Sequence, residues 1–259
     1  QLQYAAASVA HYCSAFYTGK GKGVLRFALD VIYPPRCLTC TEPTEQGANL
    51  CADCWSDTPF IAGSVCDACG APLLGDTGDA TILCDDCLAE PPTWDTGRAA
   101  VIYAGGGRRV VLGLKHGDRL DMGKPLAEWM ARPGAHLLSR ANVIVPVPLH
   151  WRRLLKRRFN QSAELARHLA EISGTQVIPD LLLRNKPTPS QDGLSRAERY
   201  QNQRGVFSVN KRYPLAKNVL LVDDVMTTGA TLSACADTLR AAGAERIDAL
   251  VLARVVREQ

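Results

Sequence analysis

The sequence contains no apolar run that approaches the roughly 20 residues needed to span a bilayer. Its first residues, QLQYAAASVAHYC, lack a basic segment leading into a long apolar core, so no secretory signal is expected. There is no low-complexity tract, and paired cysteines are the only internal repeat. The net charge of +4 is too mild to identify a nucleic-acid binder by itself.

What is present is a chain of 259 residues, 46% of them hydrophobic, which can build one large or two small domains. From Trp94 onward, strand-like and helix-like segments alternate, which is typical of an α/β fold. A helix is predicted at residues 162–172 with Ser162 as its N-cap. Buried strands are predicted at residues 99–103, 143–147, 219–222 and 247–253. The predicted fold class is therefore α/β, with a parallel sheet flanked by helices.

The most informative segment is residues 219–231, with the sequence VLLVDDVMTTGAT. Four apolar residues predict a buried strand, and Asp223 and Asp224 follow where that strand is expected to end. A short loop then opens a predicted helix, whose apolar stripe is expected to end at Gly243. The stripe consists of Leu232, Cys235, Ala236 and Leu239.

This arrangement suits a phosphorylated ribose. The unpaired N–H groups of a helix N-terminus hold phosphate, and Gly229 lets the backbone approach closely. Carboxylates can accept hydrogen bonds from a sugar diol, and ligands bind at the carboxyl ends of parallel strands. The alternative is a solvated turn or an N-cap, but the order of strand, acids, Thr-Thr-Gly and helix favours the binding site. No lysine follows the glycine, so a Walker A loop fits less well.

Eight of the ten cysteines form four CxxC pairs. Two CxxC turns can supply four thiolates to one tetrahedral Zn²⁺, so eight cysteines would fill two structural sites. Sequential pairing is favoured because the connecting loops are short, although a crossed arrangement would exchange the second and third pairs. The expected ligands are Cys37, Cys40, Cys51 and Cys54 for one ion, and Cys66, Cys69, Cys84 and Cys87 for the other.

Three other uses of these cysteines are weighed. A disulfide framework is disfavoured because the rest of the chain has the pattern of an intracellular nucleotide-type fold, from which we expect a cytoplasmic protein. Iron–sulfur ligation usually has closer spacing or a Cys-Pro ending, and four pairs are too many for a redox motif. Cys235 is expected to be a small core residue.

A second motif, PVPLHWRRLLKRRFNQ at residues 146–161, is strongly basic. It contacts either pyrophosphate or nucleic acid, or it forms a solvated basic face. Trp151 and Phe159 could stack on bases, although core packing is favoured for Phe159. The cations are Arg152, Arg153, Lys156, Arg157 and Arg158.

The segment at residues 219–231 resembles the motif of type I phosphoribosyltransferases, which bind phosphoribosyl pyrophosphate (PRPP). With YxGxxRRVVLGLKHG, FNQSAELA and SQDGLSRAER in the same order, the chain from about residue 24 resembles the ComF family of competence proteins. The family's central motif usually has a glycine where this chain has Arg158, and a side chain there could alter the pyrophosphate loop.

The resemblance implies an order of parts: a lead segment at residues 1–35 with a short helix at 24–33, a double zinc-ribbon module at 36–92, and a phosphoribosyltransferase-like domain at 93–259. It implies that Asp223 and Asp224 are catalytic residues that hold the ribose. PRPP with Mg²⁺ would be bound by Thr227, Thr228, Gly229, Ala230, Thr231, Lys115, Arg157, Asn160 and Gln161.

The resemblance also implies a role in natural transformation, in which incoming single-stranded DNA and other competence proteins are the partners. Nucleic-acid contacts would come from Arg152, Arg153, Lys156 and Arg158. Two alternatives stay open. The chain is either an active phosphoribosyltransferase of nucleotide metabolism with an unknown acceptor, in which the polar residues 184–205 close as a lid, or a catalytically silent zinc adaptor.

Overall fold

A computed structural model of the chain describes residues 35–44, 49–75, 81–116, 119–149, 159–186 and 205–256. The chain divides into two compact units, residues 1–51 and 52–259. The sheet and all the helices named below belong to the larger unit. The predicted helix at residues 24–33 lies outside the described residues, as does Cys13. Within the part of the chain that the structure describes, no helix has both the length and the apolar character needed to cross a bilayer.

The larger unit is built on a five-stranded sheet in the order β1-β7-β6-β2-β3, and every neighbouring pair in it is parallel. This confirms the predicted parallel sheet. The central strands are almost continuously buried because helices cover both of their faces. The strands are β1 (Thr96–Ile102), β2 (Val143–Pro146), β3 (Gln176–Val177), β6 (Asn218–Met226) and β7 (Arg246–Arg254).

The strand that carries the two acids is longer than the sequence predicted. We expected β6 to end at Val222, but it continues to Met226 because β7 pairs with it as far as Met226 opposite Arg254. On the other side, pairing with β2 stops at Pro146 opposite Val222. Asp223 and Asp224 therefore lie inside the strand, at the point where one of its two neighbours has ended.

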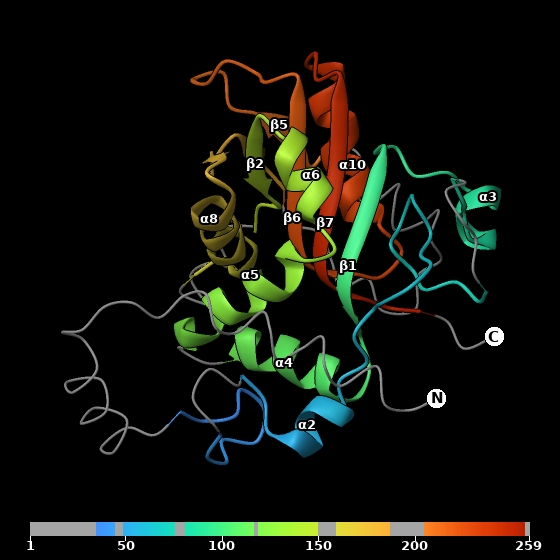
Figure 1. Cartoon of the computed structure of the whole chain (residues 1–259). Helices are drawn as coiled ribbons and strands as arrows, with labels where there is room; N and C mark the ends of the chain where they lie inside the picture. Colours follow the sequence, from blue (N-terminus) through green and yellow to red (C-terminus); the bar gives the residue numbers. More distant parts are fainter. Residues whose placement is uncertain are drawn as a thin grey trace. The chain divides into compact units, whose positions relative to one another are not determined.

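Helices cover the two faces of the sheet (Figure 1). Helix α10 (Ala230–Ala241) packs on one face, where its predicted stripe of Leu232, Cys235, Ala236 and Leu239 is buried. Cys235 is a core residue, as expected. Gly243, with φ of 112°, comes just after the end of α10. The other face is covered by α5 (Gly123–Ala131), α6 (Ala135–Arg140) and α8 (Gln161–Ser173), and α4 (Gly105–His116) contacts β1 and β7.

Helix α8 begins one residue before the prediction, and its N-cap is not Ser162. The cap is Asn160, whose backbone is extended and whose Oδ1 accepts a hydrogen bond from the N–H of Ser162 at 3.1 Å. Asn160 is held in the N-cap position because its Nδ2 also donates a hydrogen bond to the carbonyl oxygen of Val147, at 3.1 Å. The hydroxyl of Ser162 is thereby left for another partner.

Smaller elements complete the larger unit. Strands β4 (Leu182–Arg184) and β5 (Phe207–Val209) form an antiparallel pair at the two ends of the predicted polar loop, of which residues 187–204 lie outside the described residues. Two short helices, α2 (Ala52–Ser56) and α3 (Asp85–Ala89), each contain one cysteine of a CxxC pair that is buried. A single turn, η1 (Leu120–Met122), precedes α5.

Candidate functional site

The segment between β6 and α10 borders a hollow of about 230 Å³ that opens to solvent. It is lined by Asp223 and by the continuous segment Val225–Leu232, which includes the phosphate loop, defined here as Thr227–Thr231. Gly229 has φ of 77° and precedes α10 as a residue with no side chain to cap the helix. The positive end of the helix dipole therefore faces the hollow, which favours an anion there.

The two acids have different surroundings, because neighbouring residues of a strand point to opposite faces. Asp223 lines the hollow, and its Oδ1 accepts hydrogen bonds from the Ser162 hydroxyl at 2.8 Å and from the Asp224 N–H at 2.9 Å. The carboxylate of Asp224 instead forms an ion pair with Lys115 of α4, with 3.1 Å between Nζ and Oδ2. The structure thus brings together the phosphate loop and Asp223, and separately Lys115 and Asp224.

The electrostatics of the acid pair favour a proton on one member. Burial and the neighbouring charge of Asp224 raise the pKa of Asp223 to about 7, although the hydrogen bond from Ser162 acts in the opposite direction. Close carboxylates behave in this way because both cannot ionise without mutual repulsion. Near neutral pH, Asp223 can therefore exchange between a proton donor and an acceptor.

The remaining predicted ligands are placed less favourably or not at all. Both amide atoms of Asn160 make hydrogen bonds within the fold, at the start of α8. Gln161 is buried beside it, with 1% of its surface exposed. Arg152, Arg153, Lys156, Arg157 and Arg158 lie outside the described residues, as does Trp151.

Three residues that shape the site were missed by the sequence analysis. Ser162 was taken for a helix cap but binds Asp223. Arg254 is 8% exposed and donates through Nη1 to the carbonyl oxygens of Met226 and Thr227, which lead into the phosphate loop. Trp94 packs against Gly229, since a Cβ added to Gly229 would lie 2.5 Å from Cη2 of Trp94. An arginine at the end of the apolar run IDALVLAR was the one available sequence signal for Arg254.

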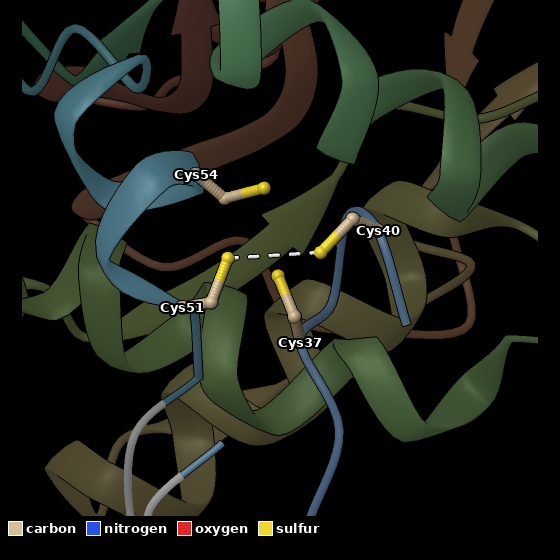
Figure 2. A group of neighbouring side chains, drawn as sticks. All are labelled: Cys37, Cys40, Cys51 and Cys54. Atoms are coloured by element: carbon tan, nitrogen blue, oxygen red, sulfur yellow. Dashed lines mark hydrogen bonds between the residues drawn. The ribbon is translucent and has the colours of Figure 1, made fainter. Parts of the chain in front are cut away.

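The first cysteine cluster consists of Cys37, Cys40, Cys51 and Cys54, whose sulfur atoms all lie within 4.8 Å of one another. Figure 2 shows the four side chains pointing toward a common centre, with 3.6 Å between the sulfurs of Cys40 and Cys51. Burial raises the pKa of Cys37, but backbone N–H groups of Cys40, Cys51 and Thr39 outweigh it and lower the pKa to about 6. That environment favours the thiolate, which is the form that binds metal.

The second cluster consists of Cys66, Cys69, Cys84 and Cys87, again with all sulfurs within 4.8 Å. The sulfurs of Cys69 and Cys84 are 3.7 Å apart. In a tetrahedron with Zn–S bonds of about 2.3 Å, neighbouring sulfurs lie about 3.8 Å apart, so both clusters fit a four-cysteine zinc site. The described cysteines form no disulfide. The prediction of two structural zinc sites with sequential ligand pairing is confirmed.

Comparisons with known proteins agree with this geometry. Residues 28–88 match the double zinc ribbon domain family, and residues 164–258 match the phosphoribosyl transferase domain family. The chain is 30% identical to Competence protein F of Haemophilus influenzae over 227 residues, which cover 85% of this chain and 96% of that one. The chain belongs to the ComF family of competence proteins.

Two further relatives are similar over at least four fifths of both chains. DNA utilization protein YhgH of Escherichia coli K12 is 28% identical over 86% of this chain and 98% of its own. Competence protein ComFC of Bacillus subtilis is 26% identical over 80% of this chain and 82% of its own. The resemblance inferred from the motifs is therefore confirmed, as is the fold class of a phosphoribosyltransferase-like sheet with an N-terminal zinc-binding part.

Proposed function

We propose that this ComF-family protein binds PRPP, with Mg²⁺, in the hollow at the end of β6, and that it acts in natural transformation on incoming single-stranded DNA in the cytoplasm. The observation that carries the first part is that Asp223 and the phosphate loop line one hollow. A carboxylate at one side and a helix N-terminus at the other match the hydroxyl groups and the 5′-phosphate of one ribose phosphate. In this proposal the zinc module covers residues 36–92 and the PRPP-binding domain residues 93–259.

The chain's own residues would divide the work. Asp223, held by Ser162, would accept a hydrogen bond from a ribose hydroxyl, and the phosphate loop would donate N–H and hydroxyl hydrogen bonds to the phosphate. Lys115 would have to release Asp224, its ion-pair partner, before it could bind the pyrophosphate. Asp223 also provides the oxygen donor that Mg²⁺ prefers, and the ion would neutralise charge on the pyrophosphate.

Titration calorimetry with PRPP and Mg²⁺ tests the site. Wild-type protein should bind PRPP, and the double variant Asp223→Ala/Asp224→Ala should lose binding by at least an order of magnitude, since it removes the acceptor for the sugar and the partner that holds Lys115. Glu128→Ala, an exposed carboxylate on α5, is the matched control and should bind as the wild type does. Undiminished binding by the double variant would refute the assignment.

The proposed role in DNA handling rests on family membership and on the basic run at residues 152–158. Lys and Arg that neutralise phosphates release counterions, so binding of single-stranded DNA should weaken with salt, by a slope of about 0.7 in log units per contact. Replacing Arg152, Arg153, Lys156 and Arg158 by Gln should reduce the slope by as much as about 3.

A control with the same change of net charge separates this patch from bulk electrostatics. Arg108, Lys124, Lys211 and Arg212 are exposed cations elsewhere in the larger unit, and replacing these four by Gln should leave most of the slope in place. Fluorescence anisotropy of a labelled oligonucleotide measures both variants. Equal losses in the two would show that the basic run at residues 152–158 is not the DNA contact.

An active transferase with an unknown acceptor is the second candidate, favoured by the pKa of Asp223 near neutrality. Such a group can take up or release a proton as pyrophosphate leaves the sugar carbon. Release of pyrophosphate from PRPP in the presence of cell extract nucleobases, with loss in Asp223→Asn, would support transfer. If the protein binds PRPP without any release, it acts as a ligand-binding member, and if it binds no phosphorylated ribose, it is a zinc adaptor.

A further inference from the structure

Trp94 joins the second cysteine cluster to the phosphate loop. Its Nε1 donates a hydrogen bond of 2.6 Å to the carbonyl oxygen of Ala68, which lies between Cys66 and Cys69 in the CxxC turn. Its ring lies against Gly229 on the other side, where an added Cβ would come within 2.5 Å of Cη2. Trp94 is 4% exposed, so the indole is enclosed between the metal-binding turn and the loop.

The neighbouring contacts hold the same two regions together. The hydroxyl of Thr93 donates to the carbonyl oxygen of Ser233, in the first turn of α10, at 3.0 Å. Gly97 of β1 approaches the turn so closely that an added Cβ would lie 2.3 Å from the oxygen of Ala68. Because protein interiors are close-packed, a displacement of the turn cannot be absorbed by empty space around residues 93–97.

Arg254 holds the residues that lead into the phosphate loop. Its guanidinium is buried and donates to the carbonyl oxygens of Met226 and Thr227.

We propose that Trp94 is a positioning residue through which the zinc-filled second cluster fixes the phosphate loop, whose entrance Arg254 also holds, so that the metal in this cluster controls how tightly the protein holds a phosphorylated ribose. The proposal rests on the proposed function for its ligand, but the ordering of the loop by the cluster can be measured without any ligand. It assigns the second zinc site a task beyond the folding of its own ribbon.

The first test replaces Trp94 by Phe, which removes the N–H donor and keeps an aromatic ring. We expect two zinc ions to remain bound, amide hydrogen exchange in residues 226–233 to become about fivefold faster, and PRPP affinity to fall about fivefold, as for one lost hydrogen bond. The matched control is Trp129→Phe, a buried tryptophan on α5 that packs edge-on against Phe60 with ring centroids 4.9 Å apart. It should leave exchange in the loop unchanged.

The second test replaces Arg254 by Lys, which keeps the charge but cannot reproduce the arrangement of guanidinium donors. The same loop peptides should exchange faster. Arg140→Lys is the matched control, because Arg140 also binds a buried acceptor, the carboxylate of Asp248, through two hydrogen bonds of 2.8 Å. A thermal melt and zinc content measured on all four variants separate general destabilisation from loosening of the loop.

The third test removes zinc from the full chain with a chelator and follows exchange at the loop together with zinc release. Loss of loop protection should coincide with release from the second cluster. Loop exchange at the wild-type rate in Trp94→Phe, in Arg254→Lys and after zinc removal would overturn the proposal, whether or not PRPP binds. Absence of PRPP binding in the wild type, with faster loop exchange in the variants, would instead overturn the proposed function and leave the coupling supported.

Discussion

The two cysteine clusters are each built from two CxxC pairs, but they differ in burial and in what packs against them. In the first cluster Cys40 is exposed and Cys51 is partly exposed, whereas in the second only Cys84 is not fully buried. All four ligands of the second cluster belong to the larger unit with the sheet. Identical metal chemistry therefore serves two different structural settings.

The difference teaches that a CxxC turn takes its role from what its backbone contacts. The turn of the second cluster, Cys66 to Cys69, accepts a hydrogen bond from Trp94 at the carbonyl oxygen of Ala68 and lies against Gly97 of β1. Both turns also close locally and in the same way, since the N–H of Cys37 donates to the carbonyl oxygen of Glu42 and that of Cys66 to the carbonyl oxygen of Ala71, each at 2.8 Å. The contact with Trp94 therefore distinguishes the second cluster, which packs behind the candidate ligand site.

The largest expected difference comes from removing one ligand of each cluster. Binding of structural zinc supplies on the order of 10 kcal/mol of folding free energy, and losing even 4 kcal/mol lowers the Tm of a domain this size by roughly 10 °C. Cys69→Ser should lower the Tm of the larger unit by about that amount, and Cys40→Ser by much less. Calorimetry with a zinc assay measures both. Equal losses in the two variants would remove the distinction drawn between the clusters.

A smaller loss of stability is expected from a change at Gly229, where Trp94 contacts the phosphate loop. Gly229→Ala should destabilise through its positive φ and through collision with Trp94, together about 2–3 kcal/mol. Gly174→Ala separates the two causes, because Gly174 has φ of 73° but nothing within 4 Å of an added Cβ. Urea denaturation should show a loss of about 1 kcal/mol for Gly174→Ala. If Gly229→Ala loses no more stability than Gly174→Ala, the ring of Trp94 moves to make room for the added methyl group.

Much of this architecture could be predicted from local sequence. Continuous apolar runs at residues 143–146 and 219–222 predicted buried parallel strands, because only strands covered on both faces can be apolar throughout. The spacing of the cysteines predicted both zinc sites, since two CxxC turns suffice for a tetrahedron. The order of acids, threonines and glycine predicted the loop before α10.

What could not be predicted depends on partners far away in the sequence. The acids were expected after the strand, but β7 extends β6 past them and divides them between the two faces of the sheet. The cap of α8 was assigned to Ser162, because nothing local shows that its hydroxyl binds Asp223. Trp94 and Arg254 had no recognisable motif, since their meaning comes from residues that lie 26 and 28 positions away along the chain, Ala68 and Met226.

The raised pKa of Asp223 predicts how stability and PRPP affinity depend on pH. Because the folded pKa, about 7, lies above the unfolded value, this group contributes stability that is present below about pH 4 and lost as pH rises to about 7. If the ionised form binds ribose, PRPP affinity should rise about tenfold between pH 6 and pH 8, as the ionised fraction does.

The same titration reports on the two clusters. Calorimetry at several pH values should show the rise in the wild type and in Cys40→Ser, and Asp223→Asn should abolish it. Trp94→Phe should shift the rise to lower pH, because a looser loop admits water and reduces the burial that raises the pKa of Asp223. A rise that persists unchanged in Asp223→Asn would belong to the ligand's own phosphate groups.

The smallest expected effect is the difference between two ion pairs, one formed by each cysteine-rich region. Asp67 lies in the Cys66–Cys69 turn and forms an ion pair with Arg98 of β1 at 2.7 Å; the side chain of Asp67 is 31% exposed and that of Arg98 is 16% exposed. Asp57, just after α2, forms an ion pair with Arg109 of α4, and both side chains are about half exposed. Hydrogen bonds to partly buried charges contribute about 1–2 kcal/mol, whereas exposed pairs contribute little.

Asp67→Asn should therefore lower the free energy of unfolding by about 1 kcal/mol, and Asp57→Asn should have no measurable effect in the same urea titration. Both substitutions keep the shape of the side chain and remove one charge, so the difference between them reports burial rather than size. If Asp57→Asn lowers the free energy of unfolding more than Asp67→Asn does, the exposed ion pair stabilises the fold more than the partly buried one. The second cluster would then not be the better supported of the two.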